Sequence, residues 1–382
     1  MRVTLGNRIV AIAAGAVIAA GAAQALATHA GAGSSPAGDA VRQAATSAAA
    51  QAATIRYWTT SRMAAALRAS AGPPTAKPST RYPGSTAANA LRPAQLVQPA
   101  KPAQPAERHA PRSLVKHLVK KAAPSPAARR APAPQGPWLT GNTTGSGLRW
   151  THGGTVADAV GKVFFTLNDV DYVCSGALVG GARPDVVLTA AHCVTGGRGP
   201  NGTTAWATNW MFIPGYSDGQ APYGEYTARR FFATSDWSGP TGGHEQYDVA
   251  FVQIATSTLH GGLGAASPPP GLPVRFAASQ DAVPASQAYV FGYPSLPPYT
   301  GLYPDYCAGP VTASRGSLRT SCAMTAGDSG GPWLAGFSPQ PGSGTIVAVS
   351  TYKVSSNLSV LYGAVLGPQA RTLYAQAVSP VR

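Results

Sequence analysis

The chain has 382 residues and a formal net charge of +15, with 29 Lys and Arg residues against 14 Asp and Glu residues. Residues 147–382 contain 12 basic and 12 acidic residues, so the first 146 residues carry the whole positive excess. A basic balance often indicates a nucleic-acid partner. Here it gives no such indication for the neutral part of the chain, and we expect no nucleic acid to bind there.

The first 27 residues have the pattern of a secretory signal peptide. Arg2 and Arg8 precede the apolar stretch Ile9–Ala20, and small residues follow up to Ala27. An uncleaved membrane anchor is the alternative, but a stretch made mostly of alanine and glycine partitions weakly into lipid. No other stretch of the sequence is long and apolar enough to span a bilayer. We therefore predict a secreted, extracellular protein whose mature form has no membrane span.

Residues 28–146 are predicted to be an Ala/Pro-rich basic pro-region or linker. The composition of residues 38–70 favours helix. Residues 71–137 lack the apolar content needed to offset chain entropy, so we expect them to be disordered or extended. An alternative role for this basic segment is to tether the protein to anionic wall polymers or membrane, in a form that high salt would release. We expect a solvated linker instead.

Beyond about Thr155 the sequence has the residue pattern of an all-β protein. Short apolar or alternating runs lie between clusters of Gly, Pro, Asn and Asp, at Val163–Leu167, Tyr172–Leu178, Val186–Ala191, Trp210–Ile213, Val249–Ile254, Ala288–Gly292, Thr345–Thr351 and Ser359–Leu366. Such spacing predicts a sandwich or barrel arrangement. The proline run at 268–270 is the best internal boundary, so we expect domains at 147–266 and 267–382. Only Pro368–Val378 has a helical pattern.

The segment Gly327–Pro332, with the sequence GDSGGP, is the strongest chemical feature. Glycines on both sides of Ser329 allow a tight turn that exposes the hydroxyl. The backbone N–H groups of Gly327 and Ser329 are then candidates for an oxyanion hole. Taken alone, the segment is also compatible with a glycine-rich turn that carries an incidental serine.

A serine nucleophile needs a general base, and the base needs an orienting carboxylate. His192 follows the apolar strand at Val186–Leu188 and is the candidate base. Asp248 opens the apolar run that follows it, where a buried carboxylate needs a partner, and the imidazole of His192 is the expected one.

These three motifs, TAAHC at His192, DVAFV at Asp248 and GDSGGP at Ser329, together resemble the trypsin/chymotrypsin-like serine peptidases, closest to secreted bacterial members with an N-terminal pro-region. The order His, Asp, Ser along the chain is that family's order. The resemblance implies two packed antiparallel six-stranded β-barrels, with His192 and Asp248 in the first and Ser329 in the second. It also implies removal of residues up to about 146 during maturation.

The order also excludes an α/β-hydrolase, although Gly327, Ser329 and Gly331 match its nucleophile elbow. That fold needs a histidine after the serine, and no His, Asp or Glu follows Ser329.

Four cysteines in an exported protein predict disulfides, and spacing alone leaves three pairings open. No C-x-x-C pair occurs, so we expect no metal site and no cofactor. The resemblance implies the pairs Cys174–Cys193 and Cys307–Cys322.

The resemblance further implies that Ala323, Ser350 and Tyr352 line the substrate pocket. Ala323 has no charge to pair with a basic substrate residue, so we expect a small or apolar residue before the scissile bond. The chain lacks the I-V-G-G segment of the animal enzymes, so Asp328 needs a partner other than a new N-terminus. We thus expect a monomeric serine endopeptidase acting on proteins or peptides. The alternative is a catalytically inactive binding protein on the same fold.

Overall fold

The computed structural model describes residues 40–69, 145–181, 183–198, 203–239, 244–255, 257–258, 265–266, 268–314, 316–354 and 356–379. The predicted signal peptide at 1–27 and the predicted linker at 71–137 lie outside these residues. No helix in the described ranges is long and apolar enough to cross a membrane.

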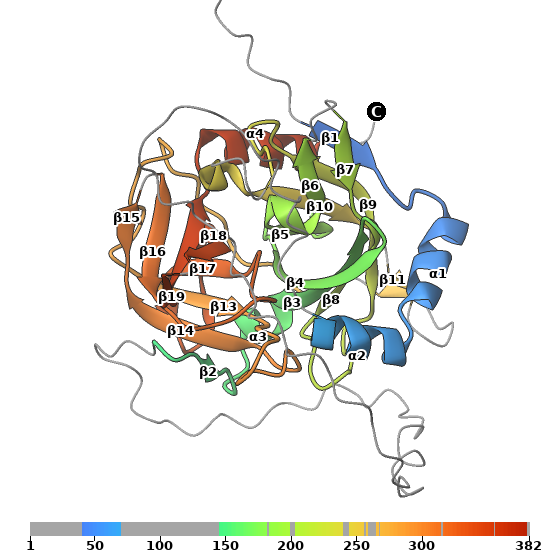
Figure 1. Cartoon of the computed structure of the whole chain (residues 1–382), viewed down its shortest axis with the longest axis horizontal. Helices are drawn as coiled ribbons and strands as arrows, with labels where there is room; N and C mark the ends of the chain where they lie inside the picture. The colour runs from blue at the N-terminus through green and yellow to red at the C-terminus, as the bar shows by residue number, and fades with distance from the viewer. Residues whose placement is uncertain are drawn as a thin grey trace, which may run out of the picture. The chain divides into compact units, whose positions relative to one another are not determined.

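The first sheet closes into a six-stranded antiparallel barrel (Figure 1). Its strands are β3 (Val160–Leu167), β4 (Val170–Leu178), β5 (Val186–Thr189), β8 (Thr208–Pro214), β9 (Tyr226–Ala233) and β10 (Ala250–Ile254). The order is β9-β10-β5-β4-β3-β8, and pairing of β8 with β9 completes the ring. A seventh strand, β1 (Ala40–Gln43), pairs with β9 from outside the ring.

The second sheet has eight strands and is also antiparallel. They are β2 (Leu148–Arg149), β13 (Gln287–Gly292), β14 (Asp305–Pro310), β15 (Thr312–Ser314), β16 (Ser317–Ser321), β17 (Pro332–Ser338), β18 (Ser343–Val354) and β19 (Asn357–Val365). The order is β15-β16-β19-β18-β17-β13-β14-β2. The sheet curls so that β14 and β16 lie side by side, and the Cys307–Cys322 disulfide joins them. The predicted all-β fold class is confirmed.

Short elements complete the described structure. They are the two-stranded sheets of β6 (Thr195–Arg198) with β7 (Thr204–Trp206) and of β11 (Ser257–Thr258) with β12 (Ala265–Ala266), the helices α1 (Ala48–Tyr57), α2 (Thr60–Ala69), α3 (Thr155–Ala159) and α4 (Pro368–Val378), and the 3-10 turns η1 (Ala191–Cys193) and η2 (Glu245–Tyr247). Helix α1 starts where Ser47 Oγ accepts a hydrogen bond from Ala50 N (3.2 Å). Helix α4 has the predicted bounds, with Pro368 in its first turn.

The described N-terminal residues 40–69, which we call the strap, wrap the outside of the first barrel. All eight residues of β3 are buried, although a barrel strand with a solvated outer face would alternate. The outer face of β3 is covered in part by Trp58 of the strap, whose ring centroid lies 5.4 Å from that of Phe164. The continuous apolar character of Val163–Leu167 therefore reflects burial on both faces.

Each end of the region 145–379 packs on the barrel that is formed mainly by the other half of that region. Helix α4, at the C-terminus, packs on β10 of the first barrel, and Gln253 Nε2 donates a hydrogen bond to Ala377 O (2.6 Å). Strand β2, near residue 148, pairs with β14 of the second sheet. The domains at 147–266 and 267–382 stay a prediction, and α4 and β2 each contact the part of the chain on the other side of that boundary.

A fully buried lysine lies where the two barrels meet. Lys162 of β3 is 0% exposed, and its Nζ donates to Ser295 Oγ (3.1 Å) and Tyr293 O (3.4 Å). Burial lowers the pKa of this amine well below its ordinary value, because a charged ammonium loses its hydration there.

We expect Lys162→Met to raise the free energy of unfolding at pH 7 by about 1–4 kcal/mol. The folded state holds the Lys162 proton more weakly than the unfolded chain, so the stability of the wild type rises with pH until the unfolded lysine also deprotonates near pH 10. The variant lacks that rise. Urea unfolding at pH 7 and pH 10 measures the difference in free energy of unfolding between variant and wild type. A difference that is as large at pH 10 as at pH 7 would contradict this prediction.

Candidate active site

The register of two barrel strands brings His192 and Asp248 together. Strand β10 pairs with β5 so that Ala250 lies opposite Thr189. His192 lies three residues after Thr189 in the turn η1, and Asp248 lies two residues before Ala250. Both side chains are therefore held at the same end of the barrel by hydrogen-bonded backbone.

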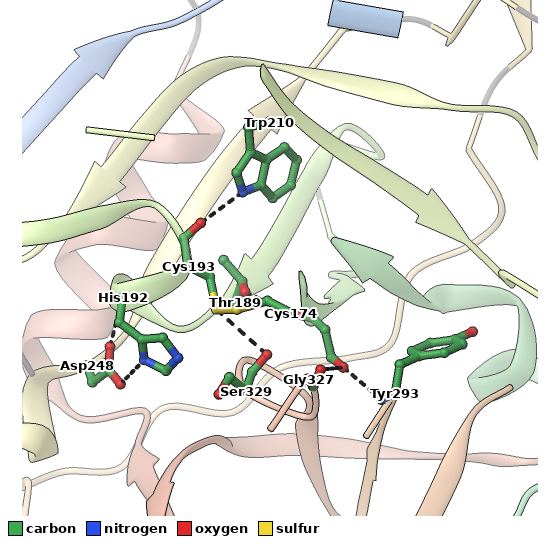
Figure 2. The surroundings of a disulfide bond; sticks show 10 residues. Cys174, Thr189, His192, Cys193, Trp210, Asp248, Tyr293, Gly327 and Ser329 are labelled. Carbon is green, nitrogen blue, oxygen red and sulfur yellow. Dashed lines mark hydrogen bonds and ion pairs between the residues drawn. A yellow bond between two sulfur atoms is a disulfide. The ribbon is translucent and has the colours of Figure 1, made fainter. Parts of the chain in front are cut away.

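Two hydrogen bonds join the pair, as Figure 2 shows. Asp248 Oδ1 accepts from His192 N at 2.8 Å, and Asp248 Oδ2 lies 2.7 Å from His192 Nδ1. Both side chains are nearly fully buried, at 3% and 2% exposure. An ionised carboxylate accepts from both nitrogens, so Nδ1 carries the proton and Nε2 is left as the acceptor of the neutral ring. His192 Nε2 is buried and forms no hydrogen bond with any described residue, Ser329 included.

The loop that carries Ser329 reaches this pair from the second barrel. Ser329 O lies 3.7 Å from the sulfur of Cys193, the neighbour of His192, so the loop lies directly beside the histidine turn. The loop needs glycine at Gly330, which has a φ of +80°. A Cβ there would lie 2.2 Å from Thr189 Oγ1, so the close approach of the two barrels also excludes a side chain.

The backbone N–H groups of Gly327 and Ser329 are the predicted oxyanion-hole donors. Within the described part of the chain, neither donates to a backbone or side-chain acceptor. Gly327 has a φ of +104°, a left-handed conformation that glycine adopts without strain. Two N–H groups that form no hydrogen bond, on a turn beside a serine hydroxyl, can together bind an anion.

Ser175, which the sequence analysis did not single out, anchors this loop. Ser175 N donates to Ser329 O (2.7 Å), and Ser175 Oγ donates to Gly327 O (2.7 Å). The same hydroxyl accepts from Tyr293 N (2.8 Å), so one fully buried side chain joins β4, the end of β13 and the serine loop. Its only sequence signal was a small polar residue in a buried strand next to a cysteine.

The Cys174–Cys193 disulfide clamps the histidine turn to β4, with the pairing that the resemblance implies. Trp210 Nε1 donates to Cys193 O (3.2 Å) and holds the turn from its other side. The ligand atoms of His192 and the two cysteines lie within 4.8 Å of one another. Because both sulfurs are bonded to each other, the cluster offers no thiolate to a metal.

Asp328 is a buried carboxylate without a hydrogen bond at Oδ2 within the described residues. Burial raises its pKa to about 7, and the nearby charge of Lys353 opposes that rise. Lys353 is 4% exposed, and its Nζ donates to Leu358 O (2.7 Å) and Cys322 O. Burial lowers the pKa of Lys353 to about 8, while Asp328 raises it. Lys353, a lone cation within the apolar strand β18, was missed by the sequence analysis.

Of the three predicted pocket residues, Ser350 contacts the serine loop, since Gly330 N donates to Ser350 O (2.8 Å). Ala323 N donates to Gly145 O (2.7 Å), and both Ala323 and Tyr352 are half-buried. Ser350 is fully buried, and its Oγ accepts from Trp333 Nε1 (3.1 Å), with no hydrogen bond to Asp248 among the described residues. The ring of Tyr352 stacks on Tyr362, with centroids 4.6 Å apart.

Several known proteins are similar to this chain. The family model of a trypsin-like peptidase domain matches residues 174–336, a range that contains His192, Asp248 and Ser329. The solved protease Anisep from Arthrobacter nicotinovorans is 34% identical, over 59% of this chain and 98% of that one, with a TM-score of 0.49. The thermostable serine protease AL20 from an extremophilic microorganism is 29% identical, over 58% and 97%, with a TM-score of 0.48. No curated protein sequence matches the chain.

Proposed function

Because this chain belongs to the trypsin-like peptidase family, we propose that it is a secreted serine endopeptidase whose catalytic triad is His192, Asp248 and Ser329. The observation that carries the proposal is the buried Asp248–His192 pair, which leaves Nε2 as a free acceptor beside the loop of Ser329. Catalytic hydrogen bonds are often unformed without substrate, so the missing Nε2–Ser329 bond is compatible with this role.

The reaction follows from these roles. Ser329 Oγ attacks the carbonyl carbon of the scissile peptide while its proton moves to His192 Nε2. Asp248 stabilises the imidazolium that forms, and the N–H groups of Gly327 and Ser329 hold the oxyanion. His192 then gives the proton to the leaving amine, which leaves an acyl-enzyme ester on Ser329. Water, deprotonated by His192, hydrolyses the ester and restores the enzyme.

We propose a small or apolar residue before the scissile bond, because Ala323 brings no charge to the expected pocket. Lys353, nearby, donates its two described hydrogen bonds to backbone carbonyls. A panel of peptides that differ only at this position tests the preference. Faster cleavage after Ala, Val or Leu than after Lys, Arg or Glu is expected, and the reverse order would contradict it.

The direct test of the function is the intact mass of the secreted protein before and after treatment with a fluorophosphonate probe. Covalent addition to the wild type, and none to Ser329→Ala, is expected. The untreated mass also reports whether residues 1–27 are removed. Absence of labelling in a folded, fully processed wild type would favour a catalytically inactive binding protein on the same fold.

We expect Ser175→Ala to lower kcat about tenfold to hundredfold with little change in KM. The variant leaves Gly327 O and Tyr293 N without their shared partner. The oxyanion-binding loop is then held less firmly in position, while the substrate pocket is unchanged. Steady-state kinetics on a peptide substrate measures the split. Ser317→Ala, a buried serine of β16, is the matched control and should keep wild-type kcat. A rise in KM alone would show that Ser175 does not position the loop.

A further inference from the structure

We propose that the strap, residues 40–69, is a permanent part of the folded enzyme and stays bound without a covalent link when the chain is cut between residues 70 and 144. This inference goes beyond the proposed peptidase activity and does not depend on it. It makes the mature protein a complex of two chains, a short strap and a catalytic body that includes residues 145–379.

The strap completes a strand edge of the first barrel. Strand β8 pairs with β9 only at Thr227 and Tyr226, so the rest of that edge of β9 has no partner from the barrel. Strand β1 pairs with this edge of β9 from Arg230 to Ala233. The ladder continues where Ala44 N donates to Arg229 O (2.8 Å) and Ala45 N donates to Ala228 O (3.0 Å). Removing the strap would expose these donors and acceptors, and exposed edges promote aggregation.

Trp58 anchors the strap on the outer face of the first barrel, where it is part of a buried hydrophobic cluster. Its side chain is 2% exposed and packs against Phe164 of β3. Its indole N–H donates to Asn209 O at the start of β8. A buried tryptophan contributes a large apolar area, and its N–H usually finds a hydrogen-bond partner, as it does here.

Asp171 of β4 forms a polar anchor beside this core. Tyr57 OH donates to Asp171 Oδ1 (2.8 Å), and Arg62 Nε donates to Asp171 Oδ2 (2.6 Å). The guanidinium also lies 3.8 Å from the centroid of the Tyr57 ring. Thr166 of β3 donates to the same carboxylate (2.8 Å), so the strap shares a hydrogen-bond network with two barrel strands.

The end of the strap reaches the junction of the two barrels. Leu67 is 9% exposed, and Leu67 Cδ2 lies 2.7 Å from where a Cβ on Gly301 would be. Lys162 Nζ lies 2.9 Å from the same point, so Leu67 and the buried lysine are close neighbours. The strap therefore helps to exclude water from Lys162, whose hydrogen bond to Ser295 leads to the serine loop through Ser295 N and Ala326 O (2.8 Å).

Maturation then yields two chains that stay together, in place of one shortened chain. Removal of residues up to about 146 would require the β1 ladder, the Trp58 site, the Asp171 network and the Leu67 contact to break together. A cut in the intervening segment breaks none of these contacts. We therefore expect the wild-type secreted protein to yield the strap peptide on denaturing mass spectrometry, even when residues 145–382 have been separated from it by cleavage.

The test places a recognition sequence for a site-specific protease between Gly84 and Ser85 of the full chain. The Ser329→Ala background prevents self-cleavage and makes the result independent of catalysis. After complete cutting, size-exclusion chromatography in native buffer at micromolar protein should show the strap fragment eluting with the catalytic body. The same sample in 6 M guanidinium should separate, as a control for the cut. A strap fragment that elutes alone in native buffer would overturn the proposal.

Variants locate the anchor. Trp58→Ala should weaken retention of the cut strap about a hundredfold or more, since truncating a buried tryptophan commonly has effects of that size. Arg56→Ala, an exposed position in the last turn of α1 two residues before Trp58, is the matched control and should be retained like the wild type. Where Trp58→Ala does not accumulate as folded protein, Tyr57→Phe with Arg62→Ala tests the polar anchor. Equal retention of that pair and the control would also count against the proposal.

Discussion

Replacing Ser329 by alanine is expected to lower kcat by about a millionfold, with KM nearly unchanged. The alanine removes Oγ, the atom that would form the acyl-enzyme. The backbone N–H groups at positions 327 and 329, which form no hydrogen bond, and the surrounding pocket remain. A residual rate about a thousandfold above the uncatalysed reaction is expected from these groups alone. Steady-state kinetics on a chromogenic peptide, with active-site titration of the wild type, measures the difference.

The fold should survive this change, because Ser329 uses its backbone carbonyl, not its hydroxyl, to bind Ser175. Thermal unfolding of the variant within about 2 °C of the wild type is the control. A Ser329→Ala protein that keeps more than a tenth of the wild-type rate would exclude this serine as the nucleophile.

Asp248→Asn is expected to lower kcat about ten-thousandfold. The amide oxygen can still accept from His192 N, but the amide NH₂ then faces Nδ1 where Oδ2 now lies, 2.7 Å away. The imidazole must present Nδ1 as acceptor and carry its proton on Nε2, so it cannot take a proton from Ser329. Measurement of kcat across pH 5–10 separates this loss from a simple shift of the profile.

Asp185→Asn is the matched control, because Asp185 lies at the end of β5 away from His192 and forms an ion pair with Arg183. It should keep wild-type kcat. Similar losses in both variants would mean that the effect of Asp248→Asn is one of general destabilisation, and the role of Asp248 as orienting carboxylate would be wrong.

Much of the fold was predictable from local pattern. Apolar runs at Val163–Leu167 and Val249–Ile254 correspond to β3 and β10, and the helix at Pro368–Val378 has the predicted bounds. Strand β9 was missed because Arg229 and Arg230 interrupt its apolar run, and they are tolerated because both lie half-buried on the barrel. Local periodicity reports one face of a strand, so a strand with charged residues at its middle gives a weak signal.

The sequence by itself determined which groups are available for chemistry: the histidine and aspartate at strand ends, and a serine flanked by glycines. Only the tertiary structure decided which groups meet. Ser175 became a loop anchor because the two barrels bring Gly327 and Tyr293 to it, over 152 and 118 positions of sequence separation. Trp58 is buried against the outer face of a barrel that begins about a hundred positions later. Spacing along a chain specifies neighbours within a helix or strand, whereas contacts between distant segments depend on strand register and barrel closure, which local patterns do not encode.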